Sequence, residues 1–197
     1  EASFVNGQGA DARFSGPEGV IVDSDGNVIV ADCNNHCIRK IARDGTVSTI
    51  AGNGTGGFAD GQGSAAQFDQ PGGVAMTACG NFVIADQCNH RLRMVTPDGH
   101  VTTVAGSGDA GFVDGPGATA QFCEPCDVAV DGAGNIFVAD YGNNKVRMVT
   151  PEGVVTTISR DQEGSANGQG LTTQFESPSG ITIDGAGDLI VASFLDH

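Results

Sequence analysis

Cysteine and histidine residues lie close together at two places in the chain, a pattern that can bind zinc. One group is Cys33-x-x-His36-Cys37 and the other is Cys88-x-His90. A structural zinc site needs four such ligands that converge with tetrahedral geometry. Two short groups do not supply that set by spacing alone, so the sequence favours disulfide bridges over zinc. We expect no bound metal and no other cofactor.

Aspartate and arginine are also paired at a fixed spacing of seven residues, once in each of three related segments. A catalytic carboxylate would normally be singular, whereas a pair that recurs suits a structural link between two neighbouring strands. We therefore predict structural ion pairs between Asp32 and Arg39, Asp86 and Arg93, and Asp140 and Arg147.

The run Asp23-Ser24-Asp25-Gly26-Asn27 resembles the start of a calcium-binding loop. It lacks the downstream bidentate glutamate that such a loop requires, and the related runs at 131–135 and 184–188 contain fewer ligands. Short turns stabilised by aspartate side chains explain the pattern better.

The elements that position these residues are repeats. The segment ADCNNHCIRK begins at Ala31, ADQCNHRLRM at Ala85 and ADYGNNKVRM at Ala139, with a spacing of 54 residues each time, and a fourth copy begins at Ala192. Each of the three complete copies contains four short apolar or alternating runs separated by turn signals such as Asp44-Gly45, which joins antiparallel strands. Four-stranded units at this period are typical of β-propeller blades. In the first copy the expected strands are 19–23, 27–32, 37–42 and 46–51.

These residues resemble a known family. The first copy reads Pro17–Asp23, Gly26–Asp32 and Asn35–Ile41, a pattern similar to the NHL repeat, and the resemblance covers essentially the whole chain. It implies an all-β fold: a β-propeller of NHL type, present as an incomplete arc of three four-stranded blades plus two strands of a fourth. It also makes His36 and His90 ordinary members of the repeat's Asn-His motif.

The repeat predicts how the chain is divided, and it leaves open blade edges, so we expect this chain to be part of a longer one. Phe14, Phe68, Phe122 and Phe175 recur where one blade follows another, and we expect their rings to be buried between blades. The predicted segments are an inter-blade connector (1–13), blade 1 (14–67), blade 2 (68–121), blade 3 (122–174) and a partial blade 4 (175–197).

The expected topology places five of the six cysteines on one face of the propeller and Cys79 on the other. A bridge from Cys88 to Cys126 or Cys123 would join blades 2 and 3, and Cys33 with Cys37 could close a small loop. Six cysteines allow 15 pairings, so this is a geometric hypothesis. Cys79 is expected to stay unpaired.

Charge and composition limit the partners and the location. The chain has 9 Lys+Arg against 24 Asp+Glu, a net charge of −15, which disfavours nucleic acid as a partner. No run of about 20 apolar residues is present, so we expect no membrane insertion. Acidity and six cysteines favour an extracellular or cell-surface location, with a cytoplasmic one as the alternative. Asn53-Gly54-Thr55 is then a candidate glycosylation site.

The inner strands carry no obvious catalytic group. The apolar runs 20–22, 74–76, 128–130 and 181–183 contain no histidine, and no carboxylate before the strand's end. The sequence therefore predicts a non-catalytic protein-interaction or scaffold module, whose partners are other proteins and the rest of its own chain. Because some propellers that resemble this one are metal-dependent lyases or lactonases, the alternative is part of such an enzyme with its active site in blades outside this sequence.

Overall fold

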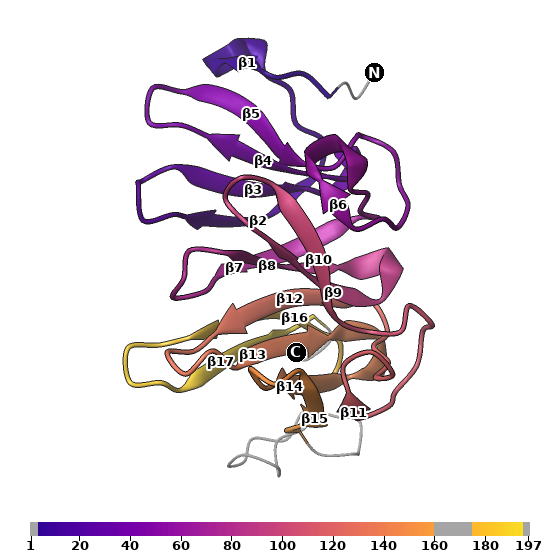
Figure 1. Ribbon diagram of the computed structural model, residues 1–197. Coiled ribbons are helices and arrows are strands. Elements are labelled where there is room, and N and C mark those ends of the chain that lie inside the picture. Colours follow the sequence, from indigo (N-terminus) through magenta and orange to yellow (C-terminus); the bar gives the residue numbers. More distant parts are fainter. Residues whose placement is uncertain (1–3, 160–174, 195–197) are drawn as a thin grey trace.

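Four short strands follow one another in each repeat, joined by tight turns in which glycine adopts a positive φ angle (79° at Gly26 and 84° at Gly45). The computed structural model describes residues 4–159 and 175–194. Within them the strands form antiparallel sheets that follow one another from the indigo N-terminal part to the yellow C-terminal part (Figure 1). The predicted all-β fold, an incomplete arc of propeller blades, is confirmed.

The three complete blades have the same strand order and are numbered here as in the sequence. Blade 1 contains β2 (Pro17–Val22), β3 (Val28–Asp32), β4 (Cys37–Ile41) and β5 (Thr46–Ala51). Blade 2 contains β7 (Pro71–Met76), β8 (Phe82–Asp86), β9 (Arg91–Val95) and β10 (His100–Ala105). Blade 3 contains β12 (Pro125–Val130), β13 (Ile136–Asp140), β14 (Lys145–Val149) and β15 (Val154–Thr157). Blade 4 is described as the hairpin β16 (Pro178–Ile183) and β17 (Leu189–Ser193).

Each complete blade has a fifth strand that the sequence analysis did not predict. The two-residue strands β1 (Gly7–Gln8), β6 (Gly61–Gln62) and β11 (Gly115–Pro116) pair with the outermost long strand of the blade that follows them in sequence. Each connector thus belongs structurally to the following blade. The structural unit therefore begins earlier than the predicted boundary, so that β6 lies in blade 2 although it falls within residues 14–67.

A single 3₁₀ turn connects the second and third strands of each blade. These turns are η2 (Cys33–Asn35), η4 (Gln87–Asn89) and η5 (Tyr141–Asn143). Each ends at a residue in the left-handed conformation, with φ of 50° at His36, 54° at His90 and 56° at Asn144. Histidine and asparagine are among the non-glycine residues that tolerate this region best.

The hydrophobic core lies between blades rather than inside one blade. One cluster joins Ile29 and Ile38 of blade 1 to Phe68, Val74 and Phe82 of blade 2. A second cluster, formed by the corresponding strands of blades 2 and 3, surrounds Phe122. Phe68 and Phe122 are fully buried, as predicted. The equivalent rings at the ends of the arc are only partly buried: these are Phe14 and Phe175.

The inner strands approach one another closely near the propeller axis. A Cβ atom on Gly19 would lie 2.5 Å from the carbonyl oxygen of Gly72 in the next blade, so only glycine fits there. The described residues contain no helix that is long and apolar enough to cross a membrane.

Candidate functional site

The predicted aspartate–arginine pairs are buried ion pairs. Asp32 and Arg39 approach to 2.7 Å, Asp86 and Arg93 to 2.6 Å, and Asp140 and Arg147 to 2.7 Å, and all six side chains are fully buried.

The Asp86 carboxylate shows how these groups are used. It also accepts hydrogen bonds from the backbone N–H of Asp69 at 2.8 Å and from Asn89 Nδ2 at 2.9 Å. Because these donors and Arg93 come from three different elements, the carboxylate fixes the entry to the blade, the 3₁₀ turn and the third strand together. Neither side chain of the pair is exposed to solvent, so its role is structural.

Each buried arginine is also held between two phenylalanine rings. The Arg93 guanidinium carbon lies 4.8 Å from the Phe58 ring centre and 5.2 Å from that of Phe68. It donates to the carbonyl oxygens of Ala59 and Gln67 at 2.8 and 3.0 Å. The arginine therefore joins the connector to the blade that follows it. The sequence signal for this arrangement is a pair of phenylalanines ten residues apart in the connectors of the three complete blades.

The two histidines of the suspected zinc groups link neighbouring blades instead. His36 Nδ1 accepts a hydrogen bond from the Gln70 N–H at 3.1 Å, and His90 Nδ1 accepts one from the Glu124 N–H at 3.1 Å. In the third copy Asn144 Oδ1 accepts the equivalent bond, from the Ser177 N–H at 2.7 Å. In the described part of the chain no group of three or more potential ligands could hold a metal ion.

All six cysteines are free thiols, so the structure lacks the predicted bridges from Cys88 to Cys126 or Cys123 and between Cys33 and Cys37. The side chains point to different neighbours. The Cys88 thiol donates to Gln70 Oε1 at 3.2 Å, while the Cys126 thiol donates to the Pro178 carbonyl at 3.1 Å, toward blade 4.

The remaining cysteines are also free thiols with other neighbours. Cys33 lies near Glu18, Cys37 packs against Gly52, and Cys123 packs against Gly142 of its own blade. Burial raises the pKa of both Cys33 and Cys37 to about 12. Cys79 is exposed.

The suspected calcium loops are turns closed by their own aspartate. Asp23 Oδ1 accepts from the N–H groups of Asp25 and Asn27 at 3.0 and 2.8 Å, and Asp131 and Asp184 accept the equivalent bonds. Asn53, the candidate glycosylation residue, is exposed, and its side-chain oxygen accepts the Thr55 N–H at 3.0 Å.

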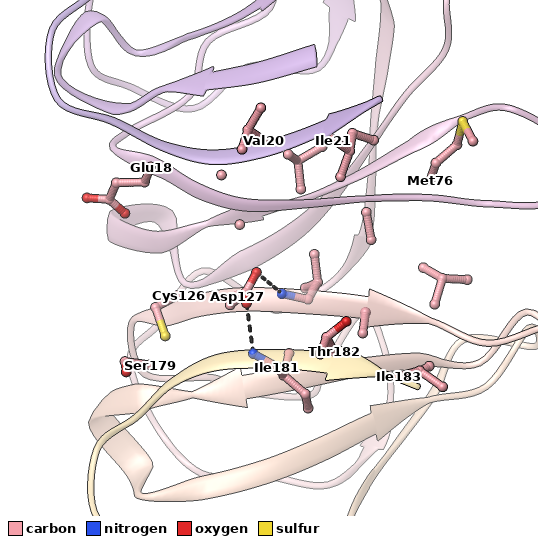
Figure 2. A pocket seen from close by; sticks show the side chains of 17 residues that line it. Glu18, Val20, Ile21, Met76, Cys126, Asp127, Ser179, Ile181, Thr182 and Ile183 are labelled. Atoms are coloured by element: carbon pink, nitrogen blue, oxygen red, sulfur yellow. Dashed lines mark hydrogen bonds between the residues drawn. The ribbon is translucent and has the colours of Figure 1, made fainter. Parts of the chain in front are cut away.

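A groove of about 580 Å³ runs along the propeller axis between the inner strands β2, β7, β12 and β16. Figure 2 shows Glu18, Cys126 and Ser179 at one end of this axial groove, with Asp127 next to them and Met76 and Ile183 farther along. The other lining side chains are mostly aliphatic: Val20, Ile21, Val74, Ala75, Val128, Ala129, Val130 and Ile181.

Asp127 is the functional candidate that the sequence analysis missed. The expected inner strand began at residue 128, but β12 begins at Pro125, so this carboxylate lies within the strand. Its Oδ1 accepts the Val128 N–H at 2.9 Å and its Oδ2 accepts the Ile181 N–H of blade 4 at 2.8 Å. Burial raises the pKa of this carboxyl. Comparing the four copies would have revealed it, because the other three have glycine here (Gly19, Gly73 and Gly180).

Comparison with known proteins identifies the repeat. The family model described as NHL repeat matches residues 14–41, 68–93 and 122–147. These three segments of the chain are NHL repeats. Protein SUPPRESSOR OF QUENCHING 1 of Arabidopsis thaliana is 36% identical over 91 residues, which are 46% of this chain and 9% of that protein. NHL repeat-containing protein 2 of Gallus gallus is 34% identical over 107 residues, which are 50% of this chain and 15% of that protein. The NHL chain therefore corresponds to a small part of these relatives.

Solved structures share the fold of this NHL chain. An auxiliary nutrient binding protein from Bacteroides thetaiotaomicron has a TM-score of 0.70 at 17% identity and covers 88% of this chain and 44% of its own. A putative gluconolactonase has a TM-score of 0.63 at 16% identity, over 91% of this chain and 56% of its own. Virginiamycin B lyase from Staphylococcus aureus has a TM-score of 0.56 at 11% identity, over 93% and 57%. At these identities the likeness shows the fold alone.

Proposed function

We propose that this NHL-repeat chain is a non-catalytic protein-interaction or scaffold module. The observation that carries the proposal is the distribution of charge. The arginines of the repeat are buried in ion pairs within the blades, whereas the acidic side chains of Glu18 and Glu124 are exposed on the face that carries the 3₁₀ turns.

Several carboxylates lie near the Cys88 thiol on this face. The pKa of the Cys88 thiol is raised mainly by partial desolvation, and the negative charges of Asp69, Glu124 and Glu18 raise it further. These carboxylates therefore surround one position of the face. Loops on a rigid scaffold commonly carry the contact surface, and a negative surface selects partners of complementary charge.

Charge reversal tests this proposal. The double variant Glu18→Lys/Glu124→Lys should lose partner proteins that the unmodified chain captures from its source cells, as measured by quantitative mass spectrometry. The matched control Asp25→Lys/Asp98→Lys changes the same charge in the turns at the opposite end of the strands and should retain them. Equal capture by both double variants would contradict the proposed contact face.

The second candidate function is part of a metal-dependent propeller enzyme of the lactonase or lyase kind, with its active site in blades outside this sequence. The axial groove with Asp127 at one end favours it, and the fold is shared with a putative gluconolactonase and virginiamycin B lyase. Hydrolysis of a sugar lactone that is abolished by a chelator and restored by a divalent metal would support it. No turnover by the full protein would rule it out.

We further propose an extracellular or cell-surface location. The net charge of −15 and the exposed Asn53 support it, whereas the free thiols remove the argument from disulfide bridges. A glycosidase-sensitive mobility shift that disappears in Asn53→Gln would support this location. Recovery of the unglycosylated protein solely from the cytosolic fraction would contradict it.

A further inference from the structure

The axial groove combines a polar end with an apolar interior. Its volume of about 580 Å³ falls within the range of small-molecule pockets, which are mostly apolar with a few polar groups that orient the ligand. Glu18, Cys126, Asp127 and Ser179 supply the polar end, and Ile21, Met76 and Ile183 line the part beyond it (Figure 2).

Asp127 is a departure from the repeat rather than a part of it. The other three blades have glycine at the corresponding place, and the fold itself therefore does not need a carboxylate there. Asp127 is accommodated because blade 2 has glycine opposite: a Cβ atom on Gly73 would lie 2.0 Å from Asp127 Oδ1. A side chain that is special to one blade is positioned at the groove by the close approach of two inner strands.

The surroundings of the Asp127 carboxylate also differ from those of the buried carboxylates at the ends of the second strands. Asp32, Asp86 and Asp140 each have an arginine partner, whereas Asp127 forms no ion pair with any residue in the described ranges. Its two backbone N–H donors leave acceptor capacity, because an ionised carboxylate offers about four lone-pair sites. A partly buried negative charge without a cationic partner is stabilised by a ligand that brings a positive charge.

We propose that the axial groove binds a small organic ammonium ion with an apolar body. The charged nitrogen contacts Asp127, with Glu18 adding negative potential at the same end, and the apolar body lies against Ile21, Met76 and Ile183. A neutral molecule of the same shape lacks the charge pair. A bare metal ion leaves the apolar lining unused. This site shares Glu18 with the protein-contact face, but it takes a small molecule and so goes beyond the scaffold function.

An NMR titration of the chain with a matched pair of probes tests the site. Cyclohexylmethylammonium chloride should shift the amide signals of Val128 and Ile181 in a saturable way. Neutral cyclohexylmethanol should bind at least about tenfold more weakly, because it cannot form the charge-assisted contact. Asp127→Asn, which keeps the side-chain size and an acceptor oxygen, should weaken ammonium binding at least about tenfold.

Two further variants separate loss of charge from loss of structure. Asp127→Gly restores the residue of the other blades and should abolish the preference for the ammonium probe. Glu124→Gln removes an exposed charge outside the groove and should leave ammonium binding unchanged. The proposal is overturned by equal binding of the two probes, by ammonium binding that is unchanged in Asp127→Asn, by the absence of saturable shifts, or by calcium chloride displacing the ammonium probe at the same amides.

Discussion

The buried carboxylates at the ends of the second strands are stable because each accepts hydrogen bonds from an arginine, an asparagine and a backbone N–H. A buried charge is costly unless a partner and further hydrogen bonds compensate it, and breaking such a pair is more damaging than replacing it. Asp86 has an arginine, an asparagine and a backbone N–H as partners. The sequence spacing predicted the pairing. The two connector phenylalanines were visible as a repeated spacing, but their contact with the arginine was not predicted because they lie about 25 to 35 residues away in sequence.

Replacing one of these arginines should show how strongly the stability of the fold depends on the buried ion pair. We expect Arg93→Met to lower the free energy of unfolding by about 3–5 kcal/mol, because it leaves the Asp86 charge buried without its partner. Denaturant unfolding followed by circular dichroism measures the change. Arg43→Met, at an exposed arginine, is the control and should change stability by less than about 0.5 kcal/mol. A loss below about 1 kcal/mol in Arg93→Met would show that the pair is dispensable.

The cysteines should differ sharply in reactivity. Only the thiolate is a good nucleophile, and burial raises the pKa of the Cys33 and Cys37 thiols to about 12. We expect iodoacetamide at neutral pH to modify the exposed Cys79 first and to leave Cys33 and Cys37 unmodified until the protein unfolds. Peptide mass spectrometry over time gives the order. Labelling of Cys33 at the rate of Cys79 would contradict the buried position.

The 3₁₀ turn is the element that joins one blade to the next. Its last residue adopts a positive φ and directs a side-chain acceptor at the first turn of the following blade. Histidine in two copies and asparagine in the third form the equivalent hydrogen bond to the next blade, since both residue types tolerate the left-handed region and both offer a side-chain acceptor. The sequence motif was visible, but the donor that each acceptor binds lies 33 or 34 residues away, and the contact depends on how the blades pack.

Exchanging these two residue types tests the link. We expect His90→Asn to keep the free energy of unfolding within about 0.5 kcal/mol, because the acceptor and the left-handed preference are retained. His90→Ala should cost about 1–2 kcal/mol, since it loses the hydrogen bond to the Glu124 N–H and places alanine at φ of 54°. The exposed His100→Ala serves as the control for thermal or denaturant unfolding. Equal losses in His90→Asn and His90→Ala would contradict the role.

The phenylalanine after each connector should be the main apolar contact between blades. Phe68 is fully buried, and Phe68→Ala should lower the free energy of unfolding by about 3–5 kcal/mol. Phe58→Ala should cost less, because 45% of Phe58 is already exposed. Parallel denaturant titrations compare the two variants. A loss below about 1 kcal/mol in Phe68→Ala would mean that this ring does not hold the blades together.

At the scale of the whole molecule, the repeat predicted the propeller arc but not which connector belongs to which blade. Sequence similarity defines the period of 54 residues, but it does not say at which residue one blade ends and the next begins. The pairing of β1 with β5 and of β6 with β10 decides this, because it attaches each connector to the blade that follows. The axial groove was missed for a related reason. It forms only where four inner strands converge, and its distinctive residue, Asp127, stands where the repeat otherwise has glycine.

The two ends of the arc present apolar surface that internal blades bury. Val20 of β2 is 63% exposed, whereas the corresponding Val74, Val128 and Ile181 are 5%, 3% and 6% exposed because a preceding blade covers them. Val22, on the same face of β2, is 60% exposed, and Phe194 at the other end of the described arc is 69% exposed. Contiguous apolar patches of this kind promote association.

We therefore expect this chain to self-associate through its end faces in a concentration-dependent way. Val20→Lys/Val22→Lys should shift the distribution toward monomer, because association would then bury two unpaired charges. The same variant should change the free energy of unfolding by less than about 0.5 kcal/mol, since these side chains have little packing to lose in the isolated chain. Size-exclusion chromatography with light scattering over a range of concentrations measures the effect. Val154→Lys, at an exposed valine of the outer strand β15, is the control and should leave association unchanged. If the double variant and the control associate equally, the end face formed by β2 is not the contact surface.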